Sequence, residues 1–155
     1  EDALSAAVLA ITHSEAKSFD LLAMRTRSGP ISMSSMRGNL LIVNIWASWC
    51  VPCRREMPSL SRLASSLDGK KAAILPVSFD RAGLQAVNEF YTEFGIDNLP
   101  GIAGEVGNLQ DVTGTVALPS TFLIDPMGMR RWSVIGEARW DDADTLHWIT
   151  SLLPS

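Results

Sequence analysis

The two cysteines of the chain, Cys50 and Cys53, follow closely on an aliphatic run at positions 40–45, and this junction constrains the fold more than any other stretch. The run is nearly continuous and rich in β-branched residues, which is typical of a strand buried on both faces of a sheet. Pro52 is compatible with the first turn of a helix, where the N–H that proline lacks has no partner. The stretch therefore predicts a central strand that leads into a helix with Cys50 at its N-terminus.

This placement predicts a reactive thiol at Cys50. Unpaired N–H groups and the positive end of the helix dipole favour an anion there, so we expect the pKa of Cys50 to be lowered. Arg54 and Arg55 add positive charge in the first turns. Cys53 lies one turn further along, and we expect it to be the more buried thiol, which resolves a mixed disulfide.

A zinc site and a purely structural disulfide are the alternatives for this cysteine pair. Zinc needs about four ligands, but the chain has no second CxxC, and its histidines, His13 and His147, are far away in the sequence. A disulfide across two residues constrains the unfolded chain very little, because that effect grows with loop length. The chemistry therefore favours a redox pair, with no metal and no cofactor.

The residues around the pair resemble a known active-site motif. Trp49-Cys50-Val51-Pro52-Cys53, after an apolar strand with Trp46, is similar to the motif of the thioredoxin superfamily. The continuation Arg54-Arg55-Glu56-Met57-Pro58 resembles the TlpA/ResA/CcmG group of extracytoplasmic thiol–disulfide oxidoreductases, and WCVPCRREMP is especially close to its TlpA branch. The resemblance extends from about position 29 to the C-terminus.

The resemblance implies a thioredoxin-like α/β fold, in which helices flank a central mixed sheet. Residues 1–28 would be an N-terminal extension, residues 29–155 the domain, and about 95–114 an insertion in it. It also implies that Cys50 and Cys53 form a redox-active disulfide and are the catalytic residues.

A second landmark lies at Val116–Asp125, where Leu118 and Pro119 precede a predicted strand. The resemblance implies a cis-proline that lies against the cysteine pair. The backbone of Leu118 would then pair with a substrate peptide by strand addition. Together with Trp49 and Pro52, these two residues would shape the substrate-docking surface. A trans-proline at the start of a strand is the alternative.

Three polar residues bear on proton transfer. Asn44 stands where thioredoxin has a buried Asp that helps to move protons to the resolving cysteine; Asn cannot titrate, so we expect a hydrogen-bonded core amide and another proton carrier. Glu56 either tunes the cysteine pair or lies on the helix surface. Asp80 either matches an acidic residue near the active site of many ResA-like proteins or caps a helix over Leu84–Phe94.

Hydrophobic periodicity and turn signals predict the other elements. Leu4, Val8 and Ile11 fall on a helical repeat, which predicts an amphipathic helix over about 3–17. We expect Trp140 to pack in the core, and Asp141 or Asp142 to cap a final helix. Further strands and helices are predicted at 31–33, 72–79, 119–125 and 129–135, and at 51–67, 84–94 and 105–112.

Composition bounds the class of protein. The chain has 155 residues, 46% of them hydrophobic, which fits one globular domain with a substantial core. Its net charge of −4 and the absence of Lys/Arg runs beyond two argue against a nucleic-acid partner. The apolar stretch at positions 3–11 is too short to span a bilayer.

The resemblance also implies partners and a location. It implies a monomeric periplasmic reductant, anchored to the membrane by a segment before Glu1. Its substrates would be cysteine-containing proteins in cytochrome oxidase or cytochrome c assembly. An upstream donor such as a membrane thiol reductase would supply its electrons.

Two alternatives belong to other functional classes. A copper chaperone of the Sco type shares this fold, but such proteins use CxxxC and a distal His, and this chain has no His between positions 14 and 146. A non-catalytic adaptor with an inert disulfide is the other alternative.

Overall fold

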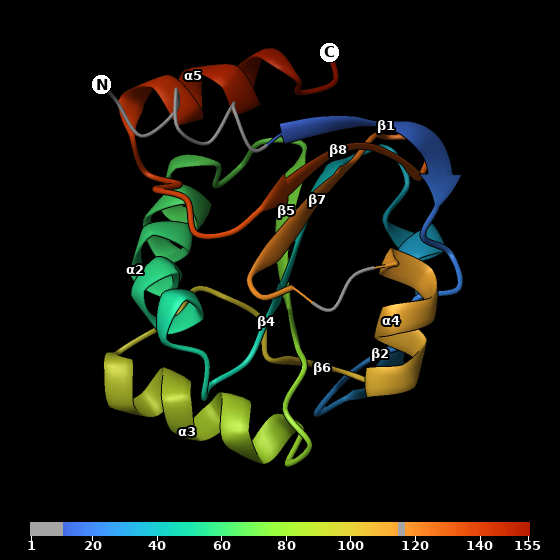
Figure 1. The fold of residues 1–155 in the computed structure, drawn as a ribbon. Helices are drawn as coiled ribbons and strands as arrows, with labels where there is room; N and C mark the ends of the chain where they lie inside the picture. The colour runs from blue at the N-terminus through green and yellow to red at the C-terminus, as the bar shows by residue number, and fades with distance from the viewer. Residues whose placement is uncertain (1–10, 115–116) are drawn as a thin grey trace.

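The computed structural model describes residues 11–114 and 117–155, which build a sheet with helices on both faces. The sheet has eight strands in the order β1-β8-β7-β4-β5-β6-β2-β3. Figure 1 shows α2 and α3 on one side of the sheet and α4 on the other. The elements, with η1 a 3₁₀ helix, are β1 (Ile11–Ser18), β2 (Met24–Thr26), β3 (Gly29–Ile31), η1 (Met33–Met36), β4 (Leu40–Trp46), α2 (Val51–Ser66), β5 (Ala72–Ser78), α3 (Leu84–Phe94), β6 (Ile102–Gly104), α4 (Val106–Thr113), β7 (Ser120–Ile124), β8 (Met129–Ile135) and α5 (Ala143–Ser151).

Strand β4 is the centre of the sheet, as the aliphatic run predicted. All seven of its residues are buried, and it pairs in parallel with β5 and antiparallel with β7. Because side chains alternate along a strand, Leu40, Ile42 and Trp46 enter one core, and Leu41 and its odd-numbered neighbours enter another. The first core holds residues of α2, α3 and α5, and the second holds Leu109 of α4.

The predicted helix over 3–17 is wrong where the structure describes it. Residues 11–18 form β1, which runs antiparallel to β8 with Ile11 opposite Val134 and Ser18 opposite Met129. The helical repeat rested on a few apolar positions, whereas the strand is set by pairing with residues more than a hundred positions away. Positions 1–10 lie outside the described residues. Strands β1 (residues 11–18) and β2 (residues 24–26) both belong to the sheet.

Helices α2, α3 and α4 and strands β5, β7 and β8 lie close to the predicted ranges. Strand β3 ends at Ile31, where the strand predicted at 31–33 begins, and β2 and η1 were not predicted. Helix α2 ends at Ser66, and β7 and β8 form the predicted hairpin. Asp142 caps α5 by accepting a hydrogen bond from the Asp144 N–H.

The predicted insertion contains β6 and α4, and Gly104 at their junction has no room for a side chain. A Cβ there would lie 2.7 Å from Leu109 Cδ1.

Candidate active site

The cysteine pair lies where β4 passes into α2. After Trp46 a tight turn follows, in which the Cys50 N–H donates to the Ala47 carbonyl over 3.2 Å. Cys50 is the N-cap of α2, and its Sγ accepts the Cys53 N–H over 3.3 Å. The two cysteines form a disulfide. Cys50 is 7% exposed and Cys53 is fully buried, which confirms the expected order of accessibility.

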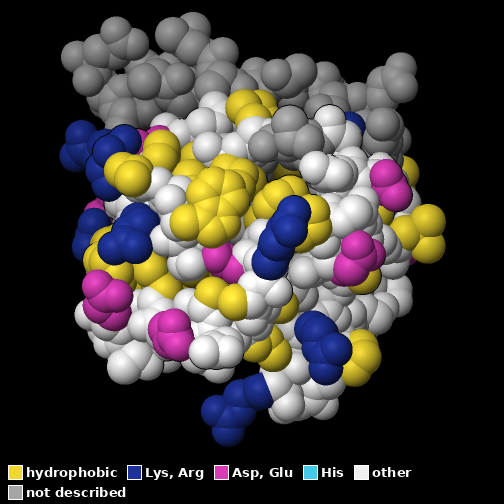
Figure 2. Space-filling view, turned by 60° about the horizontal axis from the view of Figure 1, so that its bottom comes forward, with side chains coloured by type: hydrophobic (Ala, Val, Ile, Leu, Met, Phe, Trp, Pro, Cys, Tyr) yellow, Lys and Arg dark blue, Asp and Glu magenta, His cyan; other side chains and the backbone are white. Residues whose placement is uncertain are grey.

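An apolar surface surrounds the disulfide. Trp49 is 64% exposed and Val51 is 59% exposed, while Pro52 is half-buried. Figure 2 shows the face of the molecule where β4 and β5 end; hydrophobic side chains gather near its centre, and charged side chains lie mainly around them. Such a surface suits contact with another polypeptide.

Leu118 and Pro119 lie next to this surface. Ser120 on β7 pairs with Ile45 on β4, so the residues just before Ser120 lie beside the end of β4, where the turn to Cys50 begins. The Leu118–Pro119 peptide bond is cis, which agrees with what the resemblance implied. Leu118 is half-buried, and the hydrogen bonds found among the described residues use neither its N–H nor its carbonyl.

Glu56 is buried beneath the cysteines, so its alternative position on the helix surface is wrong. It follows Cys53 by three positions on α2, which places both on one face of the helix. Glu56 is 1% exposed; its Oε1 accepts from Asn44 Nδ2 over 2.9 Å and its Oε2 accepts from the Ala138 N–H over 2.8 Å. Burial raises the pKa of Glu56 from 4.5 to about 7, against the opposing effect of these hydrogen bonds.

Asn44 is the hydrogen-bonded core amide that the sequence predicted. Besides Glu56, it donates to Thr121 Oγ1 on β7 over 2.9 Å. It therefore holds the buried carboxyl group in place without carrying a proton itself. The Ala138 N–H was not predicted as part of the site. Trp140, two positions further on, is buried, as expected.

Asp80 lies beside the turn that precedes Cys50, and of its two predicted roles the one as a cap of α3 is wrong. The N-cap of α3 is Gly83, without a side-chain hydrogen bond. Asp80 instead accepts from the Ser48 N–H, from Ser48 Oγ and from Ser78 Oγ. Strands β4 and β5 are parallel, so the residues after both strands meet at the same end of the sheet. Ser48 was not predicted to be part of the site.

Two arginines follow Cys53 in the first turns of α2, and both are engaged by neighbouring groups. Arg54 donates from Nη1 to the Ser48 carbonyl over 3.1 Å, and its guanidinium lies 5.1 Å from the Phe94 ring centre. Arg55 pairs with Glu137 over 2.8 Å. Both guanidinium groups therefore interact with these neighbouring groups.

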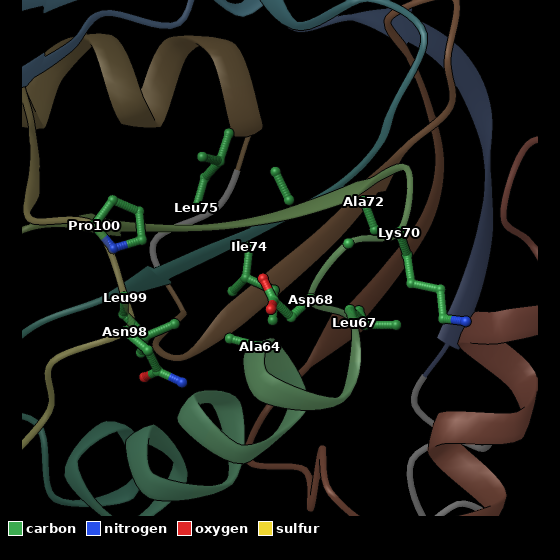
Figure 3. A pocket seen from close by; sticks show the side chains of 12 residues that line it. Ala64, Leu67, Asp68, Lys70, Ala72, Ile74, Leu75, Asn98, Leu99 and Pro100 are labelled. Atoms are coloured by element: carbon green, nitrogen blue, oxygen red, sulfur yellow. The ribbon is translucent and has the colours of Figure 1, made fainter.

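Two hollows differ in their relation to the cysteines. One, of about 630 Å³, adjoins the site, with Ser48, Trp49, Phe79 and Asp80 among its lining residues. The other, of about 260 Å³, lies at the opposite end of α2, between that helix, β5 and residues 98–100 (Figure 3). The second is lined by none of the candidate site residues.

Metal-ligating side chains do not gather in the part of the chain that the structure describes. Within residues 11–114 and 117–155, no three His, Cys, Asp or Glu residues are grouped so that they could hold a metal ion. None of the helices described there is both long enough and apolar enough to cross a membrane.

Comparison with protein families supports the assignment of the fold. The model of the AhpC/TSA family matches residues 12–132. The chain belongs to the AhpC/TSA family. The fold is thioredoxin-like, as predicted: the solved structures of a DsbF homologue from Corynebacterium diphtheriae and of StoA from Bacillus subtilis superpose with TM-scores of 0.72 and 0.67. They are 18% and 22% identical, with 92% of this chain covered in each case and 93% and 98% of those chains.

Two proteins with related sequences have names that refer to thiol–disulfide chemistry. The thiol:disulfide interchange protein DsbE of Pseudomonas fluorescens biotype C is 33% identical over 118 residues, 72% of this chain and 62% of that protein. The thiol-disulfide oxidoreductase ResA of Bacillus subtilis (strain 168) is 28% identical over 103 residues, 66% of this chain and 56% of that protein. The chain thus spans less than two thirds of the length of these relatives. The resemblance to the TlpA/ResA/CcmG group is confirmed.

Proposed function

We propose that this protein is a thiol–disulfide oxidoreductase that reduces disulfide bonds in extracytoplasmic proteins. One observation carries the proposal: the Cys50–Cys53 disulfide lies at the N-terminus of helix α2, with Cys50 7% exposed and Cys53 fully buried. This asymmetry gives the two thiols different tasks, since only Cys50 is accessible to a second protein. The names of the relatives DsbE and ResA support the same chemistry over the Sco-type alternative.

The exchange proceeds in two steps from the reduced protein. The Cys50 thiolate attacks one sulfur of a substrate disulfide, and the other substrate sulfur leaves as a thiolate that takes up a proton. Cys53 then loses its proton and attacks Cys50 Sγ, which releases the second substrate thiol and forms the Cys50–Cys53 disulfide. Two electrons pass to the substrate, and a dithiol donor returns them.

Glu56 is the proton carrier for Cys53 in this proposal. Its pKa of about 7 lets it exchange a proton near neutral pH, which an ordinary carboxyl group does poorly. It lies one turn from Cys53 on the buried face of α2 and can take up the proton directly or through one water. Asn44 cannot titrate and instead positions Glu56 by the 2.9 Å hydrogen bond.

Substrate docking uses the surface around the disulfide. The exposed ring of Trp49 and the half-buried Pro52 provide apolar contact beside Cys50. The backbone of Leu118, next to the cis Pro119, offers an N–H and a carbonyl to an extended substrate segment. Together they bring a substrate disulfide alongside Cys50.

The relatives and the motif support a proposal for where the protein acts and with which partners. We place the protein in the periplasm, attached to the membrane by a segment outside this chain, with cytochrome c or cytochrome oxidase assembly proteins as substrates. A membrane thiol reductase would be the electron donor, and the protein would act as a monomer without a cofactor. The thiol-disulfide names of DsbE and ResA support the class of substrate.

Trapping the mixed disulfide tests the proposal. The reduced protein should reduce a disulfide-containing protein substrate, and the Cys50→Ser variant should not. The Cys53→Ser variant should accumulate a covalent complex through Cys50, visible by mass spectrometry and lost on adding dithiothreitol. The assigned order of attack would be contradicted if the Cys50→Ser variant still reduced the substrate. It would also be contradicted if the Cys50→Ser variant formed a covalent complex through Cys53.

A further inference from the structure

Asp80 ties the turn before Cys50 to the neighbouring strand. Ser48 in that turn donates its N–H to Asp80 Oδ2 over 3.0 Å and its hydroxyl to Oδ1 over 2.7 Å. Ser78, the last residue of β5, donates its hydroxyl to Oδ2 over 2.8 Å. Asp80 is 6% exposed, so these hydrogen bonds replace most of the water that a carboxylate would otherwise bind.

Ser48 is also held from the opposite side. Its carbonyl accepts from Arg54 Nη1 over 3.1 Å, and the Arg54 guanidinium lies over the Phe90 and Phe94 rings at 5.7 Å and 5.1 Å. The N–H, the hydroxyl and the carbonyl of Ser48 are therefore all engaged. A residue held at three points leaves little freedom to the two positions that follow it, Trp49 and Cys50.

A carboxylate suits this position better than an amide would. Ionised Asp has only acceptors, and the two Ser48 groups and the Ser78 hydroxyl can all be donors to it. An Asn in its place would turn an NH₂ group towards at least one of these donors. Within residues 11–114 and 117–155, Asp80 forms no ion pair, and it does not cap α3. The hydrogen bonds to Ser48 are its main long-range contacts.

We propose that Asp80 is a positioning residue that acts through Ser48 to hold Cys50 at the N-cap of α2. In that position Cys50 Sγ meets the Cys53 N–H, and the two sulfurs are close enough to bond. Preorganisation of this kind raises the effective concentration of one thiol towards the other. Loss of the hydrogen bonds between Asp80 and Ser48 therefore shifts the equilibrium between the Cys50–Cys53 disulfide and the dithiol towards the dithiol. The consequence for substrate reduction rests on the proposed function, whereas the equilibrium of the pair does not.

A double-mutant cycle on the full chain tests the proposal. The variants are Asp80→Asn, Ser48→Ala and both together, each equilibrated with glutathione redox buffer at pH 7, with the fraction of disulfide measured by acid quench and mass spectrometry. We expect Asp80→Asn to shift the equilibrium constant about tenfold towards the dithiol, and Ser48→Ala to shift it less, in the same direction. The double variant should match Asp80→Asn alone, because both changes act on the same contact between Ser48 and the Asp80 carboxylate.

Asp125→Asn is the matched control. Asp125 also accepts backbone N–H groups, from Met127 and Met129, but it follows β7 at the opposite end of the sheet. This variant should unfold at lower urea concentration and keep the wild-type glutathione equilibrium. The proposal is overturned if Ser48→Ala matches wild type while Asp80→Asn does not, if the two shifts multiply, or if Asp125→Asn shifts the equilibrium as much. Failure to reduce protein substrates would contradict the proposed function alone.

Discussion

Glu56 should make the stability of the oxidised protein fall as pH rises, opposite to the usual effect of a carboxyl group. Burial raises its pKa in the folded protein to about 7, whereas the ordinary value is 4.5. The folded state therefore holds a proton that the unfolded chain releases between these two pH values. The stabilisation is fully present below pH 4.5 and is lost as pH rises through about 7.

The size of the effect follows from the gap between the two pKa values. The gap is about 2.5, and each pKa unit corresponds to about 1.36 kcal/mol, which gives roughly 3 kcal/mol. Glu56 is 1% exposed, so solvent screening does not reduce this figure much. A change of this size is a large part of the 5–15 kcal/mol by which domains of about this size are stable.

The perturbation is Glu56→Gln, which removes the titration and keeps the shape. The new amide can be satisfied, because Asn44 Oδ1 is buried without a hydrogen-bond partner among the described residues and can accept from it once the Asn44 side chain turns over. The control is Glu93→Gln, which removes an exposed carboxyl group from α3.

Urea unfolding of the oxidised proteins from pH 4 to 8.5 gives the comparison. The free energy of unfolding of wild type should fall relative to Glu56→Gln by roughly 3 kcal/mol across this range. The difference between wild type and Glu93→Gln should stay constant over most of it. Parallel curves for wild type and Glu56→Gln would refute the raised pKa and, with it, the role of Glu56 as proton carrier.

Three further substitutions separate docking from packing. Trp49→Ala removes an exposed ring, so kcat/KM for a protein disulfide should fall about tenfold with an unchanged melting temperature; a lowered melting temperature would show that the ring supports the fold. Asn44→Ala leaves Glu56 and Thr121 without their amide donor, and urea unfolding should show a loss of about 1–3 kcal/mol, where no loss would mean that the contact is replaced. Gly104→Ala places a Cβ 2.7 Å from Leu109 and should cost about 1–3 kcal/mol, unless α4 can move away at no cost.

The parts of the site that are local in sequence could be predicted from it. The strand, the turn and the helix around Cys50 and Cys53 each follow from residues within a few positions, and the relative burial of the two thiols follows from helix geometry. Leu118 and Pro119 could be placed near the pair only through the resemblance, because their approach depends on the register between β4 and β7.

The parts that depend on distant contacts could not be predicted. Glu56 is buried because the Ala138 segment, 82 positions away, covers it, and nothing near Glu56 in the sequence shows this. Asp80 has the residue type of a helix cap, but its carboxylate bonds to Ser48, 32 positions earlier. The sequence predicts a helix where β1 lies, because only the pairing of this segment with β8 distinguishes a strand from a helix.

The reduction potential of the Cys50–Cys53 pair tests the central claim most directly. In strong oxidants of this fold the reduced form is stabilised, whereas here Cys53 is fully buried, which disfavours a thiolate at that position. Equilibration of the full chain with glutathione at pH 7 should therefore give a potential at or below about −200 mV, on the side of thioredoxin at about −270 mV. A value near that of DsbA, about −120 mV, would contradict the account of this protein as a reductant.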